Sequence, residues 1–166
     1  PVRRRGYRLA GHPVQEACLE AVAEAADGDA AEIPRAVDGC GVETYALPLE
    51  RMALAFARLP GLEGADRILA AMQAYPDHIR GPRAADSLLM RHGEGWTAKG
   101  GAEGLLCAVG PDGTGLALKV EDGNTRAVRP ALRELLRRLG TDVPELAPVP
   151  VLNSLGEQVG ELVANS

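Results

Sequence analysis

The most constraining stretch of this chain is residues 96–124, where a lysine, Lys99, is followed at once by two glycines, Gly100 and Gly101. Two apolar runs then flank a Pro-Asp-Gly-Thr-Gly turn, which predicts an antiparallel hairpin. Glycines let a ligand approach the backbone closely, and the lysine supplies a point charge beside them. The pattern is therefore more typical of the wall of an active site than of a plain surface hairpin.

Helical periodicity appears on both sides of this hairpin. The expected helices run from Pro13 to about 26, over 48–59, over 62–75, after Pro82 through 88–90, and over 125–139. The expected strands cover residues 94–99, 105–110, 115–121 and 158–164, while 31–47 is expected to be irregular. Segregated helices and antiparallel strands predict an α+β fold, with helices packed on a small antiparallel sheet. Residues 1–166 then form a single domain or part of one.

Charge and cysteine content exclude several classes of function. The formal net charge is −5 and no basic stripe with interleaved aromatic residues is present, so nucleic acid is not an expected partner. No apolar run approaches the length of a membrane span. The three cysteines match no zinc-finger or CxxC spacing, and with no signal peptide they indicate free thiols in a cytoplasmic protein. The chain begins at Pro1 without methionine, so we expect that residues precede it.

Several segments, each weak alone, occur together in one order along most of the chain. They are Gly-His-Pro-Val-Gln at 11–15, Asp-Gly-Cys-Gly-Val at 38–42, Thr-Tyr-Ala-Leu-Pro-Leu at 44–49, Leu-Met-Arg at 89–91, Ala-Lys-Gly-Gly-Ala-Glu-Gly at 98–104 and Leu-Ala-Leu-Lys-Val-Glu-Asp-Gly-Asn at 116–124. In this set the chain resembles the bacterial L-asparaginase II family, the rhizobial-type or thermolabile asparaginases. One departure is Glu43, where that family usually has proline, which removes a constraint on the loop.

The resemblance implies a fold similar to that of serine β-lactamases and serine-type glutaminases, in which a strand with a lysine and small residues lines the cleft. It covers only the C-terminal half of such an enzyme. The family's Ser-x-x-Lys nucleophile motif, second catalytic serine and Cys-Ser-Gly-Lys-His segment precede the His-Pro-Val-Gln motif and are not in this chain. Ser87 has no lysine at the spacing that a Ser-x-x-Lys role requires.

The same resemblance implies roles for five residues. Lys99 would support a catalytic serine as a base or electrostatic group, with Gly100 and Gly101 beside the substrate; the alternative is a solvated lysine at a strand end. Asp38 would contact the α-amino group of the substrate, or else form a turn with the following glycine. Cys40 would be a zinc ligand in the complete enzyme, or else a thiol in a tight loop, because one residue alone cannot make a zinc site.

The resulting hypothesis is hydrolysis of L-asparagine to aspartate and ammonia through a serine acyl-enzyme whose nucleophile lies outside this chain. The alternative is a catalytically silent fragment that binds a ligand or a complementary half. A third option, prompted by the fold analogy alone, is a protein that interacts with β-lactams. A half-domain exposes apolar surface along its sheet and first helix, so we also expect an N-terminal complementary segment or self-association as a partner.

Overall fold

The computed structural model describes residues 4–165 of the chain, and it confirms an α+β fold. The α-helices in this part are α1 (Pro13–Ala26), α2 (Leu49–Arg58), α3 (Ala65–Ala74), α4 (Asp77–Arg80), α5 (Ala85–His92) and α6 (Val128–Arg138). The strands are β1 (Arg35–Val37), β2 (Glu43–Tyr45), β3 (Thr97–Gly100), β4 (Leu105–Val109), β5 (Gly115–Lys119), β6 (Val149–Leu152) and β7 (Gln158–Leu162).

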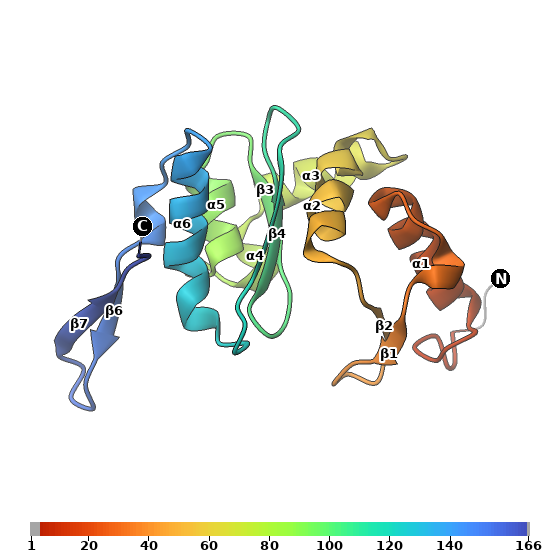
Figure 1. The fold of residues 1–166 in the computed structure, drawn as a ribbon, viewed down its shortest axis with the longest axis horizontal. Helices are drawn as coiled ribbons and strands as arrows, with labels where there is room; N and C mark the ends of the chain where they lie inside the picture. Colours follow the sequence, from red (N-terminus) through yellow and green to blue (C-terminus); the bar gives the residue numbers. More distant parts are fainter. Residues whose placement is uncertain (1–3, 166) are drawn as a thin grey trace.

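A three-stranded antiparallel sheet of order β3-β4-β5 lies at the centre of the molecule. Seen edge-on in Figure 1, it has α5 and α6 on one side and α1, α2 and α3 on the other. The predicted hairpin between β4 and β5 is confirmed: Gly113 takes a positive φ of 84°, and Asp112 accepts hydrogen bonds from the backbone N–H and hydroxyl of Thr114. Glycine is favoured at 113 because this φ strains any other residue.

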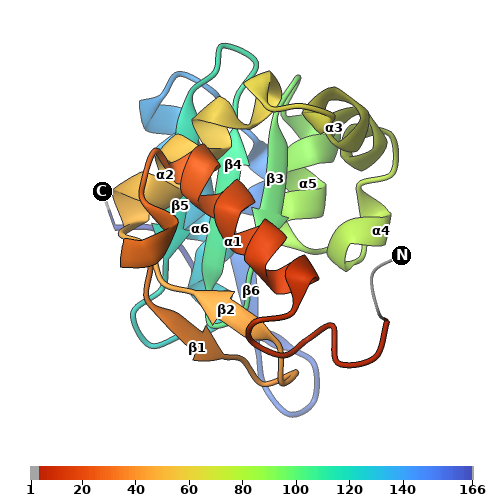
Figure 2. The ribbon, with the colours of Figure 1, turned by 90° about the vertical axis from the view of Figure 1, so that its right-hand side faces the viewer.

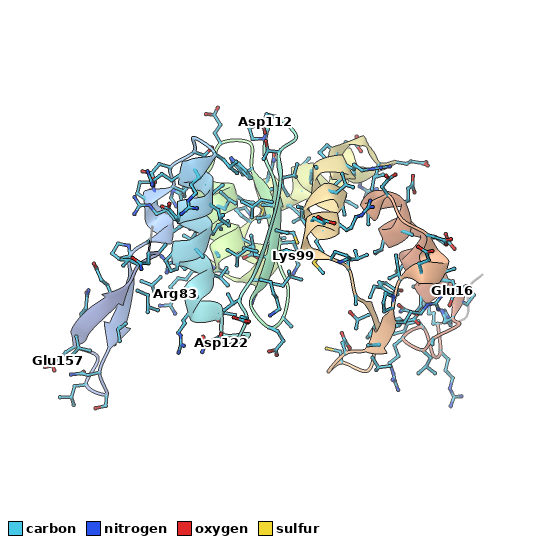
Figure 3. The ribbon with its side chains drawn as sticks, viewed as in Figure 1. Glu16, Arg83, Lys99, Asp112, Asp122 and Glu157 are labelled. Carbon is cyan, nitrogen blue, oxygen red and sulfur yellow. The ribbon has the colours of Figure 1, made fainter. Side chains whose placement is uncertain are left out.

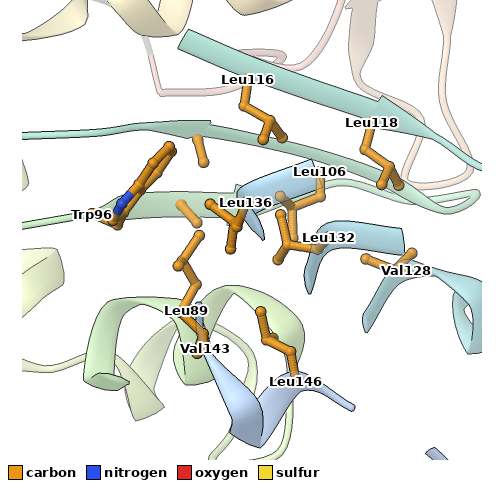
Figure 4. Close-up of a cluster of buried hydrophobic side chains, with 12 residues drawn as sticks. Leu89, Trp96, Leu106, Leu116, Leu118, Val128, Leu132, Leu136, Val143 and Leu146 are labelled. Atoms are coloured by element: carbon orange, nitrogen blue, oxygen red, sulfur yellow. The ribbon is translucent and has the colours of Figure 1, made fainter. Parts of the chain in front are cut away.

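The main hydrophobic core fills the space between the sheet and the pair α5 and α6 (Figure 4). Alternate strand residues point into it, as the period of two along a strand requires. Its buried members are Leu89, Trp96, Ala98, Leu106, Ala108, Leu116, Leu118, Val128, Leu132, Leu136, Val143 and Leu146. One face of the sheet is thus fully covered, and the leucine and valine side chains packed there are almost completely buried.

The opposite face of the sheet is covered less completely. Helix α2 packs against β5 and β4, so closely that a Cβ on Gly115 would lie 2.1 Å from the carbonyl oxygen of Ala53. Helix α1 packs on α2, and Figure 2 shows it in front of the sheet with β1 and β2 below it. None of the residues of α2 is fully buried. The layer formed by α1 and α2 therefore packs on this face of the sheet without covering it completely.

Two strand pairs were not predicted. Residues 31–47, expected to be irregular, contain the antiparallel pair β1 and β2, in which Arg35 lies opposite Tyr45. The prediction was wrong there because three-residue strands are too short to show a period of two. In the tail, the expected strand at 158–164 is present as β7, but its partner β6 was not predicted. Pro150 is tolerated in β6 because this two-stranded sheet leaves an outer edge that needs no N–H donor.

Helix starts differ from the expected ones for identifiable reasons. Helix α3 begins at Ala65 and not at 62, because Gly64 has a φ of 75°. Asn124 caps the turn before α6 through the N–H of Arg126, so Pro130 falls in the first turn of a late-starting helix, where its missing N–H costs nothing. His12 caps α1 by accepting a hydrogen bond from the N–H of Val14.

Candidate active site

Lys99 lies on β3, the edge strand of the central sheet, and is exposed. It pairs in register with Cys107 of β4, so both side chains point to the face that α1 and α2 cover. Figure 3 shows Lys99 on that side of the sheet. Its ammonium donates a hydrogen bond to the carbonyl of Gly100, which keeps the charge at the end of the strand.

Gly100 is held by groups from the other face of the sheet. Its N–H donates to Oδ2 of Asp86 over 2.8 Å, and Asp86, only 1% exposed, also accepts from the N–H of Ser87. A Cβ on Gly100 would lie 2.1 Å from Nη1 of Arg80, so a glycine is needed for Arg80 to lie where it does. The strand end is therefore fixed by a buried carboxylate and covered by a guanidinium.

Gly101 continues this arrangement around the turn. Its N–H donates to the carbonyl of Leu105 over 2.8 Å, and its own carbonyl accepts from Arg80 over 3.3 Å. Both of its backbone groups are thus engaged. The segment that follows Lys99 is a hydrogen-bonded turn, and not a loose loop.

Asp38 and Cys40 lie in the turn between β1 and β2. Oδ1 of Asp38 accepts hydrogen bonds from the N–H groups of Cys40 and Val42, each over 2.9 Å. This is the turn-forming geometry that the sequence offers as the alternative to substrate contact. The second carboxylate oxygen of Asp38 is not part of these hydrogen bonds, and Cys40 is exposed.

Glu43, the residue that stands where proline was expected, anchors the same hairpin. Its side chain is nearly buried and its Oε1 lies 3.3 Å from Nη1 of Arg35. Arg35 also binds Glu16 of α1, and this ion pair lowers the pKa of Glu16 and raises the pKa of Arg35. This ion-pair network ties the hairpin to α1, while Oε2 of Glu43 is buried without a hydrogen-bond partner among the described residues.

The structure brings Lys99, Gly100 and Gly101 together, but it places Asp38 and Cys40 on a separate hairpin. Across residues 4–165 no hydrogen bond or ion pair joins the two groups, and no cluster of three or more His, Cys, Asp or Glu residues is arranged to hold a metal. Zinc needs three or four ligands. The described residues therefore do not fit a zinc ion, and the ligand role of Cys40 stays a prediction.

Two residues of this site were missed by sequence reasoning, Arg80 and Asp86. Asp86 precedes Leu89 by three positions, so helical geometry places it on the same face as a core leucine. A carboxylate on the apolar face of a helix is an available signal for a buried, hydrogen-bonded role. Arg80 carries no such signal, because it ends a four-residue helix on the surface.

A serine nucleophile is not provided by Ser87. Its hydroxyl is fully buried and donates to the carbonyl of Pro76 over 2.9 Å. This agrees with the sequence, in which no lysine follows Ser87 at the required spacing. The residue stabilises the start of α5 against the turn at Pro76.

An apolar groove lies on the same face of the sheet as Lys99. It has a volume of about 400 Å³ and opens between α1, α2 and the beginning of β4. Its lining comprises Ala21, Val22, Ala25, Leu47, Met52, Ala55, Phe56, Leu59, Leu62, Leu105 and Cys107. Burial raises the pKa of the Cys107 thiol to about 11, which fits a structural thiol and not a reactive one.

Comparison with known proteins assigns this chain to a class of protein. The family match supports an asparaginase-type hydrolase, and the α+β fold is compatible with it. Residues 2–164 match the L-asparaginase II family, and the chain belongs to that family. Among curated proteins, none is similar enough in sequence to match the chain. In residues 4–165 no helix has the length and apolar character needed to cross a bilayer.

Proposed function

We propose that this chain supplies the lysine-bearing wall of an L-asparagine amidohydrolase that works through a serine acyl-enzyme. The observation that carries the proposal is the position of Lys99, exposed on the edge strand of a sheet whose other face is a closed core. Family membership supplies the reaction, hydrolysis of the side-chain amide of asparagine to aspartate and ammonia.

In this proposal Lys99 stabilises or deprotonates the catalytic serine. A cation beside the serine favours the alkoxide, and later the oxyanion of the tetrahedral intermediate. Gly100 and Gly101 lie beside the substrate in this proposal. Because Arg80 fills the space that a Cβ on Gly100 would take, the substrate approaches the strand end from the face that carries Lys99. Asp38 contributes its free carboxylate oxygen to the substrate ammonium. Cys40 stays a candidate ligand only where other residues complete its coordination.

The serine itself comes from a segment outside residues 1–166, which we take as part of a larger domain. The apolar groove supports this, since a groove of about 400 Å³ lined only by apolar side chains is stabilised when another segment covers it. A second copy of the chain is the alternative cover. We place the protein in the cytoplasm, because free thiols persist in a reducing compartment.

The second candidate function is a catalytically silent fragment. The observation that favours it is the sequence itself, in which no serine is followed three positions later by lysine. A silent fragment keeps the fold and the groove, and binds a ligand or a complementary half without turning over substrate.

Ammonia release from L-asparagine distinguishes the two. The assay compares the chain alone, a segment of an L-asparaginase II that carries the Ser-x-x-Lys motif alone, and their mixture. Amide hydrolysis is expected only in the mixture. Lys99→Ala should lower that activity by about a hundredfold or more, the usual contribution of a positioned base.

The matched control is Lys119→Ala, because Lys99 and Lys119 are the two lysines of the chain. Lys119 ends β5, is exposed and donates to the carbonyl of Val120. Equal activity of the two variants would overturn the role of Lys99. A mixture that forms a stable complex by light scattering and yet releases no ammonia would favour the silent fragment.

A further inference from the structure

Three arginines surround a small cavity on the side of the sheet opposite Lys99. Arg80 ends α4, Arg83 lies in the connection to α5, and Arg129 lies in the first turn of α6. The cavity has a volume of about 190 Å³, and Figure 3 shows Arg83 on the α6 side of the molecule. The remaining lining residues are Ala84, Ala85, Leu105, Leu106, Thr125 and Val128.

The residues that line this cavity include three positively charged side chains and no negatively charged one. The buried carboxylate of Asp86, on α5, accepts hydrogen bonds from the N–H groups of Gly100 and Ser87, and no ion pair joins it to the three arginines among the described residues. Three guanidinium groups around one small volume repel one another, and solvent screens part of this repulsion at the exposed Arg80 and Arg83. An anion in the cavity would remove that cost.

The hydrogen-bond donors of the three side chains are also largely unused. Arg83 is exposed and makes no hydrogen bond or ion pair with the residues that the structure describes. Arg129 donates through Nη2 to the carbonyl of Glu145, but its Nε is buried without a partner. Arg80 uses one nitrogen on the carbonyl of Gly101. A buried donor without a partner costs free energy, so Nε of Arg129 indicates a missing acceptor.

The size and chemistry of the cavity indicate what fits. Guanidinium groups bind the paired oxygens of phosphate and carboxylate through two parallel hydrogen bonds. A volume of about 190 Å³ is below the range of pockets for drug-sized ligands, so the occupant is small. A triple positive charge favours a doubly charged ion over a singly charged one. We propose that Arg80, Arg83 and Arg129 bind a small oxyanion of the phosphate type.

The phosphate proposal does not depend on the amidohydrolase proposal, although Arg80 belongs to both sites. Its occupant lies on the far side of β3 from Lys99, with Arg80 between the cavity and the Gly100–Gly101 turn. Binding would hold Arg80 in place and stabilise the folded chain by mass action. The occupant is either free phosphate or the phosphate group of a small ester.

The test is binding of inorganic phosphate to the chain by isothermal titration calorimetry, with thermal unfolding as a second readout. Saturable one-to-one binding and a rise in Tm are expected. Arg83→Gln should weaken binding by about tenfold, the loss of one charge-assisted hydrogen-bonded pair. Arg83 is exposed and makes no hydrogen bond or ion pair among the described residues, so this variant is expected to fold.

Arg67→Gln is the control, because Arg67 is an exposed arginine of α3 outside the cavity. It should leave the affinity for phosphate unchanged. Sulfate should compete and chloride should not. Tighter binding of glycerol phosphate than of phosphate would assign the occupant as an ester, and the reverse would assign the free ion. Absence of saturable binding, or equal weakening by the two variants, would overturn the site.

Discussion

The carboxylate of Asp86 and the backbone N–H of Gly100 are joined by a buried hydrogen bond of 2.8 Å. It links helix α5 to the end of strand β3, across the face of the sheet that carries the core. Because Lys99 is the neighbouring residue, the position of its ammonium depends on a carboxylate that lies on the other side of the strand. The candidate site is thus supported by a residue that substrate never needs to touch.

Replacing Asp86 tests this support. Asp86→Ala leaves the N–H groups of Gly100 and Ser87 without acceptors in a buried position, so the free energy of unfolding should fall by about 3 kcal/mol. Urea denaturation measures the change. Asp66→Ala, at the exposed start of α3, should cost well under half as much. Equal midpoints for the two variants would show that the buried carboxylate carries no special share of the stability.

The contact between α2 and β5 gives a second prediction. In Gly115→Ala the new Cβ would meet the carbonyl oxygen of Ala53 at 2.1 Å, and a backbone atom cannot yield as a flexible side chain does. Helix α2 must therefore shift, at a cost of about 2 kcal/mol. Gly28→Ala is the control, because nothing lies within 4 Å of its added Cβ. Thermal unfolding measures the Tm of both variants. A Gly115→Ala protein as stable as the Gly28→Ala control would contradict the close packing of α2 on β5.

The thiols should react at very different rates. Cys18 and Cys40 are exposed, whereas burial raises the pKa of Cys107 to about 11. Iodoacetamide at pH 8 should therefore alkylate Cys18 and Cys40 and spare Cys107, since the thiolate is the nucleophile. Peptide mass spectrometry counts the modified sites. Rapid labelling of Cys107 in the folded protein would show that the groove opens readily to solvent.

The raised pKa of Cys107 also predicts the direction of alkaline unfolding. A thiol that binds its proton more tightly when folded contributes stability below its ordinary value of 9.0, and that contribution is lost as pH rises through about 11. Cys107→Ala should weaken this part of the alkaline transition. Tm values measured between pH 8 and pH 11 provide the comparison.

Glu134 of α6 gives a prediction at acid pH. Hydrogen bonds from Arg137 and Arg138 lower its pKa from 4.5 to about 2. A carboxylate with a lowered pKa stabilises the fold above its unfolded value, and the effect disappears as pH falls towards 2. Glu134→Gln should thus lower Tm at pH 7 and leave it nearly unchanged at pH 2. Glu24→Gln serves as the comparison, and the same pH dependence in both would contradict the assignment.

The helices and the central hairpin were predictable because their signals are local. Asp112 and Gly113 specify a tight turn, and the apolar spacing in α1 and α6 exceeds two turns of helix. The pair β1 and β2 was missed since strands of three residues carry no readable period. Strand β6 was missed because it contains Pro150, and proline is disfavoured in strands except at a sheet edge.

The candidate site was predictable only where a residue type and its neighbours coincide in sequence. Lys99, Gly100 and Gly101 are adjacent, so local chemistry was enough to single them out. Arg80 and Asp86 reach the same turn from α4 and from α5, and only the packing of those helices on β3 brings them there. The arginine cavity is beyond sequence reasoning for the same reason, since Arg129 lies 46 positions after Arg83.

The two faces of the central sheet are covered unequally, so the two parts of the chain that cover them differ in how freely their sequences can change. Strand β3 takes its rigidity from the closed core against α5 and α6, all built from residues after position 84. The earlier layer of α1 and α2 contains no side chain that this core requires. Substitutions in the N-terminal layer can therefore accumulate and alter the cover of the groove, while the lysine strand keeps its place.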